Sequence, residues 1–325
     1  MEFAPSSPFL FGARAGRIII AVVTLVARVN GGGDYLVRSI GAGGRIRVLA
    51  VRTSRTVEEA RLRHETTPVA TAALGRALTA AALLGALLKG KETVTLRIIG
   101  DGPLGGVIAD ADAEGNVRGY VKNPRVDLPL KEASKLEVGA AIGRRGFLHV
   151  TRDLGLKEPY TGSCPLVSGE IAEDLARYFA HSEQIPSACA LGVRVNREGV
   201  VAAGGLLVQV LPGTEDLEDK ARMLEENLKG LGAVSSLIEE GASPEDLVAM
   251  ATRGVPTRIL GAQEVRFRCR CSRERIEEVL VSLPPEQLAE LLSTREGSSE
   301  SLIEACCHFC RERYRFRPEE LARDK

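Results

Sequence analysis

The sequence predicts an α+β fold built from an N-terminal domain of mixed sheet and helix, a helical linker and a small C-terminal domain with a four-cysteine zinc site. Three observations support this fold: alternating apolar and polar stretches separated by glycine turns, one long apolar helix, and four cysteines clustered near the C-terminus. We place the N-terminal domain at residues 34–213, the linker at 214–263 and the C-terminal domain at 264–325. With 325 residues, the chain is long enough for this division and for one sizeable core.

The first 33 residues need a separate interpretation. A mostly apolar run from Ile18 to Ala27 follows Arg17, but it is too short to span a bilayer, which takes about 20 residues. The run is similar to the apolar region of a signal peptide, yet no clean small-residue cleavage pattern follows it. We therefore interpret residues 1–33 as a non-native or wrongly assigned start, so that the folded chain begins at Asp34.

The N-terminal domain opens with a predicted β-hairpin. Between Asp34 and Val51, two alternating stretches flank a glycine-rich turn. A helix follows, and Thr56 is its predicted N-cap because Glu59, three residues later, completes a capping box.

A second helix is predicted from Pro68 to about Lys89, and it is apolar nearly all round. Its length approaches that of a membrane span, but Arg76 and the mild alanine, glycine and threonine composition favour a helix buried in a soluble core. Gly75 and Gly85 are expected to let neighbouring elements approach it closely.

Further strands complete the N-terminal domain. The glycine cluster from Gly100 to Gly106 joins two of them, and we interpret it as tight turns rather than a phosphate loop, because neither a Lys-Ser/Thr pair nor a helix start follows it. The predicted strands are Thr93–Ile99, Val107–Asp112, Val117–Val121, Phe147–Arg152, Ala190–Val195 and Val200–Val210, with a helix at about Glu170–His181.

The linker range has a different composition. Residues 215–231 and 234–238 are predicted to form charged helices, and Ser243 caps a third helix that ends before Gly254. Their apolar stripes are narrow, so we expect these helices to depend on packing against the N-terminal domain. Two interpretations stay open: an ordinary helical linker, or a marginal segment that unfolds on demand.

The most informative motif is Cys269-x-Cys271, followed after 35 intervening residues by Cys307-x-x-Cys310. One such pair also occurs in redox motifs and by chance, whereas two pairs supply the four soft ligands of a tetrahedral zinc ion. We predict a closed, all-thiolate zinc site. The spacing alone favours a structural zinc that stabilises a segment too small to bury a core.

Arginines surround both cysteine pairs. Nearby cations lower thiol pKa values and offset the negative charge of four thiolates around one divalent ion, so these thiols should be oxidisable. Glutamates are interleaved with the arginines, which argues against a phosphate-binding stripe. The arginines are Arg266, Arg268, Arg270, Arg273, Arg275, Arg311, Arg313, Arg315 and Arg317.

Local signals also predict the elements around the cysteines. Ser272 caps a helix, and Pro284-Pro285 opens another that carries Leu288, Leu291 and Leu292. Tyr314 and Phe316 alternate on a short strand and are expected to pack under the metal site.

Composition excludes several classes. Formal net charge is zero, so neither a nucleic acid nor an anionic membrane is indicated as the main partner. Seven cysteines, five of them between Cys269 and Cys310, do not resemble the even framework of a secreted protein. We expect a reducing, cytoplasmic compartment.

Two rival functions remain at this point. A zinc-ribbon protein that binds RNA or DNA predicts salt-dependent binding, and the balanced charge speaks against it. A thiol-disulfide oxidoreductase that uses Cys307 and Cys310 normally needs the first cysteine at a helix N-terminus, whereas here a short aromatic strand follows the pair.

The sequence resembles the heat shock protein 33 family of redox-regulated bacterial holdase chaperones. The most specific part of the resemblance is the run from Arg268 to Arg275 together with Cys307-His308-Phe309-Cys310 and Tyr314-x-Phe316. It covers about residues 34 to 320. Upstream matches are His64-Glu65-Thr66, Gly75-Arg76-Ala77-Leu78, Gly100-Asp101-Gly102-Pro103, Arg118-Gly119-Tyr120-Val121, Gly155-Leu156, Thr161-Gly162, Ser168-Gly169-Glu170, Ser182-Glu183-Gln184 and Gly204-Gly205.

The resemblance implies a non-enzymatic oxidant sensor. It implies that Cys269, Cys271, Cys307 and Cys310 bind one Zn²⁺ in the reduced, inactive state, and that disulfides Cys269–Cys271 and Cys307–Cys310 form on oxidation while zinc leaves. The linker then unfolds, and the protein binds unfolding clients without ATP. The family also forms a homodimer on activation.

Three features depart from the family pattern. Cys306 adds a fifth thiol beside Cys307, which leaves mispairing or ligand exchange open. Cys164 and Cys189 lie outside the motif and are expected to be buried small hydrophobes. The extension 1–33 has no counterpart, and His308 is not needed as a ligand because four thiolates already complete a tetrahedron.

Overall fold

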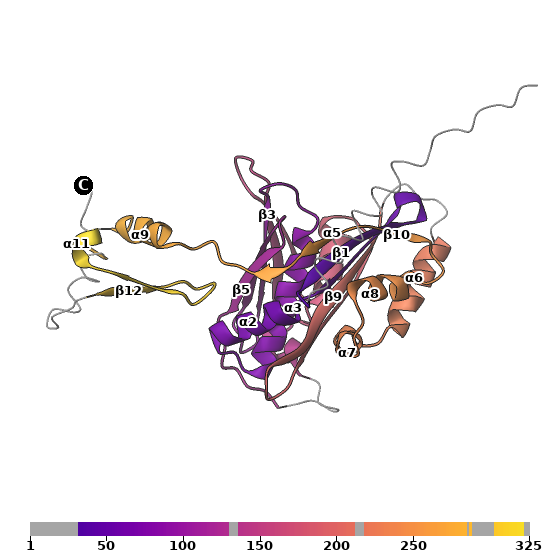
Figure 1. The fold of residues 1–325 in the computed structure, drawn as a ribbon, viewed down its shortest axis with the longest axis horizontal. Helices are drawn as coiled ribbons and strands as arrows, with labels where there is room; N and C mark the ends of the chain where they lie inside the picture. Colours follow the sequence, from indigo (N-terminus) through magenta and orange to yellow (C-terminus); the bar gives the residue numbers. More distant parts are fainter. Residues whose placement is uncertain (1–31, 130–135, 212–217, 285, 288–301, 322–325) are drawn as a thin grey trace, which may run out of the picture.

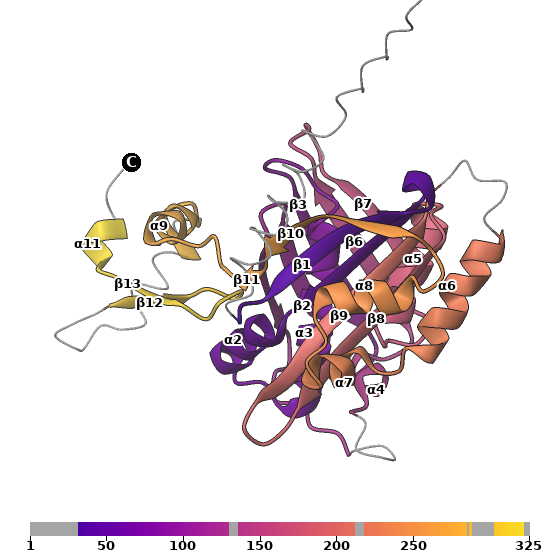
Figure 2. The same cartoon turned by 45° about the vertical axis from the view of Figure 1, so that its right-hand side comes forward.

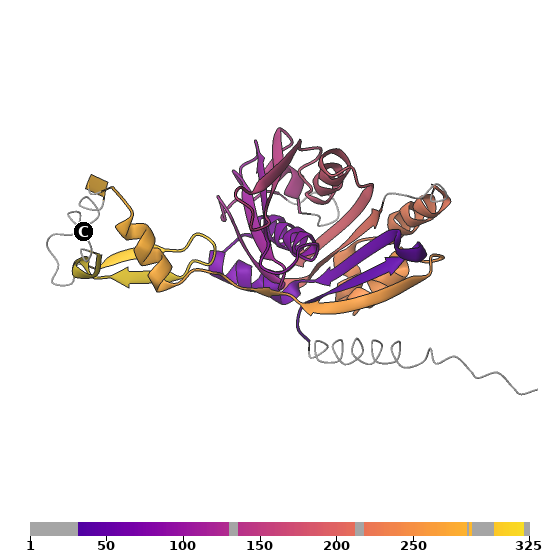
Figure 3. The same ribbon diagram turned by 90° about the horizontal axis from the view of Figure 1, so that it is seen from above.

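The computed structural model describes residues 32–129, 136–211, 218–284, 286–287 and 302–321. In this part of the chain, two β-sheets lie on either side of one central helix, and a small two-stranded module extends from one end (Figures 1 and 3). The predicted α+β fold is confirmed. The extension that precedes residue 32 lies outside the described residues.

The first sheet has five strands in the order β10-β1-β2-β9-β8, and all neighbours in it are antiparallel. The predicted hairpin forms β1 and β2, joined by the 3-10 turn Ala42–Gly44. The sequence does not predict β10, which lies largely in the range assigned to the helical linker but pairs with β1 at the sheet edge. The strands are β1 (Tyr35–Gly41), β2 (Ile46–Arg52), β8 (Ser187–Val195), β9 (Val200–Val210) and β10 (Thr257–Glu264).

The second sheet has six strands in the order β11-β5-β4-β3-β6-β7. Its edge strand β11 is parallel to β5, while the other neighbours are antiparallel. The glycine cluster joins β3 directly to β4, with positive φ at Gly105 and Gly106, so the prediction of tight turns is confirmed. The strands are β3 (Thr93–Gly100), β4 (Val107–Asp112), β5 (Asn116–Val121), β6 (Gly146–Asp153), β7 (Tyr160–Pro165) and β11 (Arg266–Phe267).

The central helix α3 (Pro68–Gly85) is the apolar helix that the sequence predicts. It passes the length and hydropathy test for a membrane span, but 89% of it is buried inside the protein between the two sheets. It ends at Gly85 rather than Lys89, because the backbone tightens into turns with Leu87 N bonded to Leu84 O at 3.0 Å. A Cβ on Gly85 would lie 2.8 Å from Asp112 O, so the expected close approach is real. Two shorter helices lie nearby, α4 (Val138–Ile142) and α5 (Ala172–Ser182).

The predicted cap of the first helix is wrong. Helix α2 (Ser54–His64) starts three residues earlier, after the N-cap position Thr53, whose side chain makes no capping bond. Instead the Asp34 carboxylate accepts hydrogen bonds from both the backbone N–H and the hydroxyl of Thr56, each 2.7 Å long. A distant acidic residue therefore satisfies the helix N-terminus, where negative charge is favourable.

We expect Asp34→Ala to destabilise the reduced protein by about 1–3 kcal/mol, because the buried N–H of Thr56 loses its acceptor. Urea unfolding measures this change. The exposed Asp127 provides a matched control, and Asp127→Ala should leave the midpoint nearly unchanged. Equal midpoints for wild type and Asp34→Ala would contradict the capping role.

Three helices cover the outer face of the five-stranded sheet (Figure 2). They occur where the sequence places the linker helices, and Ser243 caps the third one by accepting from Asp246 N, as predicted. Apolar side chains of the sheet, among them Val37, Val48 and Leu206, form a second core with Leu247 and Val248 of this cover. The helices are α6 (Glu218–Gly230), α7 (Val234–Glu239) and α8 (Pro244–Ala251).

The C-terminal module is small. Its described apolar core contains three buried residues, Ile303, Phe316 and Leu321. Ser272 caps its first helix by accepting from Arg275 N, as predicted, whereas the helix expected after Pro284 falls mostly outside the described residues. Its elements are α9 (Arg273–Val281), β12 (Ile303–Cys306), β13 (Arg313–Phe316) and α11 (Pro318–Leu321).

Candidate metal centre

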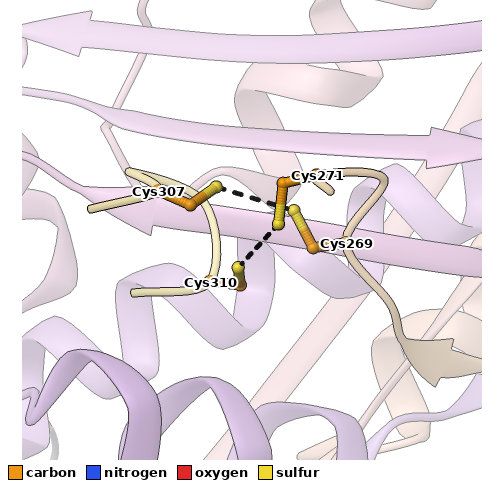
Figure 4. Close-up of side chains that lie close together, drawn as sticks. All are labelled: Cys269, Cys271, Cys307 and Cys310. Carbon is orange, nitrogen blue, oxygen red and sulfur yellow. Dashed lines mark hydrogen bonds between the residues drawn. The ribbon is translucent and has the colours of Figure 1, made fainter. Parts of the chain in front are cut away.

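The four predicted ligands come from two segments that the fold brings together. Cys269 and Cys271 lie between β11 and α9, and Cys307 and Cys310 lie in the turn between β12 and β13. The Sγ atoms of Cys269 and Cys307 are 3.8 Å apart, and those of Cys271 and Cys310 are 3.3 Å apart (Figure 4). The two pairs therefore face each other.

This geometry fits one metal ion. One ligand atom from each cysteine lies within 4.8 Å of the others, and two of the four thiols are buried. In a tetrahedral zinc site with Zn–S bonds of about 2.3 Å, neighbouring sulfurs lie about 3.8 Å apart. The sulfur separations here, from 3.3 Å to at most 4.8 Å, lie around that spacing, and the all-sulfur donor set is the one that soft or borderline cations prefer.

Two side chains donate hydrogen bonds to the sulfurs. The hydroxyl of Tyr314 lies 3.2 Å from Cys271 Sγ, and Nη1 of Arg118 lies 3.5 Å from Cys269 Sγ. Tyr314 thus packs against the site as predicted. Phe316 is fully buried in the small core of the C-terminal module.

The contact from Arg118 is one that sequence reasoning missed. Arg118 lies on β5 of the core, 151 residues before Cys269, and no local pattern links the two. The one sequence signal that pointed to Arg118 was that Arg118-Gly119-Tyr120-Val121 is among the segments that resemble the family. Three of the arginines near the cysteines in sequence pair with glutamates instead: Arg313 and Arg315 with Glu304, and Arg273 with Glu320.

The protein environment shifts the thiol pKa values in different directions. Burial would raise the pKa of Cys269, but hydrogen bonds from Arg118 and Cys271 outweigh it and lower this pKa to about 7. Burial raises the pKa of Cys310, and burial likewise raises that of Cys271 despite the bond from Tyr314. Cys269 is therefore more readily converted than Cys271 or Cys310 to the thiolate that binds metal or attacks an oxidant.

The remaining cysteines lie apart from this cluster. Cys306 is exposed, and its Sγ contacts the carbonyl oxygen of Cys307 at 3.9 Å. Cys164 is buried in the main core, where burial raises its pKa, and Cys189 packs against the same core with its pKa raised by burial to about 12. Cys164 is therefore the buried small hydrophobe that the sequence analysis expects, whereas Cys189 is only partly buried.

The fold and the cysteine cluster define a two-sheet α+β protein with a C-terminal candidate metal module. A family model described as Hsp33 protein matches residues 34–317. The chain is 50% identical over 291 residues to the 33 kDa chaperonin of Desulforamulus reducens, an alignment that covers 89% of this chain and 96% of that protein. It is 54% identical over 290 residues to the 33 kDa chaperonin of Symbiobacterium thermophilum, again with 89% and 96% coverage.

A solved structure agrees. The crystal structure of the 33 kDa chaperonin (heat shock protein 33 homolog) of Thermotoga maritima matches with a TM-score of 0.80 and 42% identity, and the match covers 89% of this chain and 96% of that one. The chain belongs to the Hsp33 family, as its resemblance implies. This is a family of chaperonins, and no enzyme family is indicated.

Proposed function

We propose that this protein is a redox-regulated, ATP-independent holdase that binds unfolding proteins under oxidative stress. The observation that carries the proposal is that helices α6 to α8 cover an apolar sheet face and lead, through β10, into the four-cysteine module. A change at the cysteines is thereby linked along the chain to the cover over an apolar surface.

In the reduced state, Cys269, Cys271, Cys307 and Cys310 bind one Zn²⁺. The donor set and spacing support zinc, which would supply most of the folding free energy of this module. The module has little else to stabilise it, since its described core holds three buried apolar residues.

Oxidation opens the switch. Each disulfide forms when two thiols give up two electrons and two protons to an oxidant such as peroxide, which becomes water. We propose the pairs Cys269–Cys271 and Cys307–Cys310, because the family resemblance implies them. Sulfurs joined in disulfides no longer ligate zinc, so the module and then helices α6 to α8 lose order.

The partners follow from this proposal. Clients are unfolded or partly unfolded proteins, and the active form is a homodimer in the cytoplasm. No nucleic acid or membrane partner is proposed, since Arg273, Arg313 and Arg315 of the C-terminal module pair with glutamates and the apolar helix α3 is buried. Under this proposal, residues 34–213 form the core, residues 214–263 the linker and residues 264–325 the switch.

The oxidoreductase alternative lacks its main structural requirement. Cys307 and Cys310 lie in a turn between two strands, and among the described residues no helix begins at Cys307 to stabilise its thiolate.

The proposal predicts that oxidised, zinc-depleted protein suppresses aggregation of a heat-denatured client, whereas reduced, zinc-loaded protein does not. Zinc content and light scattering, measured on both states of one preparation, test it. Reduction with zinc should restore the inactive state. Equal suppression by the two states would falsify the redox switch, and a nucleic-acid-binding protein would instead show salt-dependent binding in reducing agent.

A further inference from the structure

The turn that carries Cys307 and Cys310 is seated on the core of the protein. Four side chains of the core contact this turn, two from the end of α2 and two from β5. We call them the aromatic cradle: Arg63, His64, Arg118 and Tyr120. The views agree that the β12–β13 end of the module approaches the core beside α2 and β5 (Figures 1 and 2).

Phe309 is the side chain that the cradle contacts most closely. Its ring meets the ring of Tyr120 edge-on, with the centroids 5.2 Å apart, and the guanidinium carbon of Arg118 lies 4.0 Å from its centroid. An edge-on aromatic pair and a cation over a ring are both favourable and specific to aromatic side chains. The cradle therefore selects an aromatic residue.

The same cradle also contacts the backbone of the turn. Nε2 of His64 lies 3.0 Å from the carbonyl oxygen of Phe309, and Nη1 of Arg63 donates to the carbonyl oxygen of Cys310 at 3.3 Å. His64 is 6% exposed, so this ring nitrogen reaches the turn from within the core. Backbone carbonyls are common to every sequence, so these contacts would accept any peptide.

The charges of the cradle do not favour a phosphate. Arg118 is paired with Asp110 at 2.8 Å, and Arg63 is paired with Glu59 at 2.7 Å. Arginines already paired with carboxylates present little net positive charge to an added phosphate, whereas their planes still stack on rings and their N–H groups still donate to carbonyls. An aromatic residue in an extended, solvent-exposed chain is the ligand chemistry that remains, and unfolding proteins expose such residues because aromatic side chains are largely buried in folded ones.

We propose that the aromatic cradle is a client-binding site that the protein's own Phe309 occupies in the resting state. This inference rests on the proposed redox function, because release of the turn requires the metal module to open. The cradle is formed by the end of α2 and by β5 of the six-stranded sheet, so it is separate from the sheet face under α6 to α8. Oxidation would then uncover two surfaces, one of them selective for aromatic residues.

The test uses the full chain and a short glycine and serine peptide with one central tryptophan. The protein contains no tryptophan, so peptide fluorescence reports binding directly. Oxidised wild type should bind this peptide, and a phenylalanine peptide should displace it better than a leucine peptide does. Tyr120→Ser should weaken binding about three- to tenfold, as loss of one aromatic pair predicts.

Tyr160 provides the matched control. It is an exposed tyrosine at the far edge of the same sheet, and Tyr160→Ser should bind like wild type. Phe309→Ala should bind the peptide while reduced, with its zinc content intact, because the ring position against Tyr120 and Arg118 is then empty although the metal site remains closed. Reduced wild type should not bind it.

The outcomes separate the two proposals. If oxidised wild type fails to suppress client aggregation, the redox function fails. If it suppresses aggregation but Tyr120→Ser binds the peptide as tightly as wild type, or Tyr160→Ser loses binding equally, the cradle is not a client site. This inference would also be overturned if oxidised wild type did not bind the peptide, including the case in which a second copy of the chain occupies the cradle.

Discussion

Cys307→Ser is expected to abolish stoichiometric metal binding and to unfold the C-terminal module even under reducing conditions. Cys307 is 8% exposed, and its sulfur faces Cys269 Sγ at 3.8 Å. A hydroxyl is a poor zinc ligand, and a structural zinc contributes on the order of 10 kcal/mol or more to the folding of a small module. The few buried apolar residues of this module cannot replace that contribution.

The chain offers a close control, because Cys306 precedes Cys307 directly and is exposed. Cys306→Ser should retain one metal ion and a protected module. In both variants, the metal released when the thiols are modified gives the metal content. Hydrogen exchange of β12 and β13 gives the protection of the module. A Cys307→Ser protein that binds one equivalent of zinc with normal protection would show that Cys307 is not a ligand, and metal loss in Cys306→Ser would point to ligand exchange.

Leu247→Ala is expected to make the reduced, zinc-loaded protein active as a holdase. Leu247 on α8 is fully buried in the second core, between the linker helices and the five-stranded sheet. Truncation of a buried leucine costs about 2–5 kcal/mol. A single layer of such side chains, among them Leu224, Val234 and Ile238, attaches helices α6 to α8 to the sheet. A loss of this size in that layer should detach the cover and expose the sheet face without oxidation.

Light scattering of a denatured client measures the activity, and hydrogen exchange of α6 to α8 measures the release of the cover. Leu260 on β10 is the matched control, since it is 44% exposed, and Leu260→Ala should stay inactive while reduced. Zinc content should remain normal in both variants. A Leu247→Ala protein whose helices exchange rapidly but that does not bind clients would separate linker release from activity.

The metal site illustrates how far local sequence carries a prediction. Four cysteines at two short spacings leave few arrangements open, and the structure brings all four into one cluster. The strands of the β3-β4-β5 meander follow the same logic, because alternation and glycine turns are local signals. Caps at Ser243 and Ser272 were also predictable, since each depends on residues within one turn.

The failures have one physical origin. Thr56 matches the sequence pattern of a capping box, yet its backbone N–H donates to the carboxylate of Asp34, which lies outside the helix. β10 has only a weak local pattern, and pairing with β1 makes it a strand at the sheet edge. In both cases, a partner distant in the chain supplies the hydrogen bonds that the local pattern does not.

By itself, the sequence determined the α+β class, most of the strands and helices, and the set of thiols that can bind a metal, because periodicity, caps and ligand spacing act between near neighbours. Only the tertiary structure decided that Arg118 donates to Cys269 and that Phe309 meets Tyr120. Those contacts exist because the cysteine turn docks on β5, and the docking of two surfaces depends on their shape and charge in space, which no local pattern encodes.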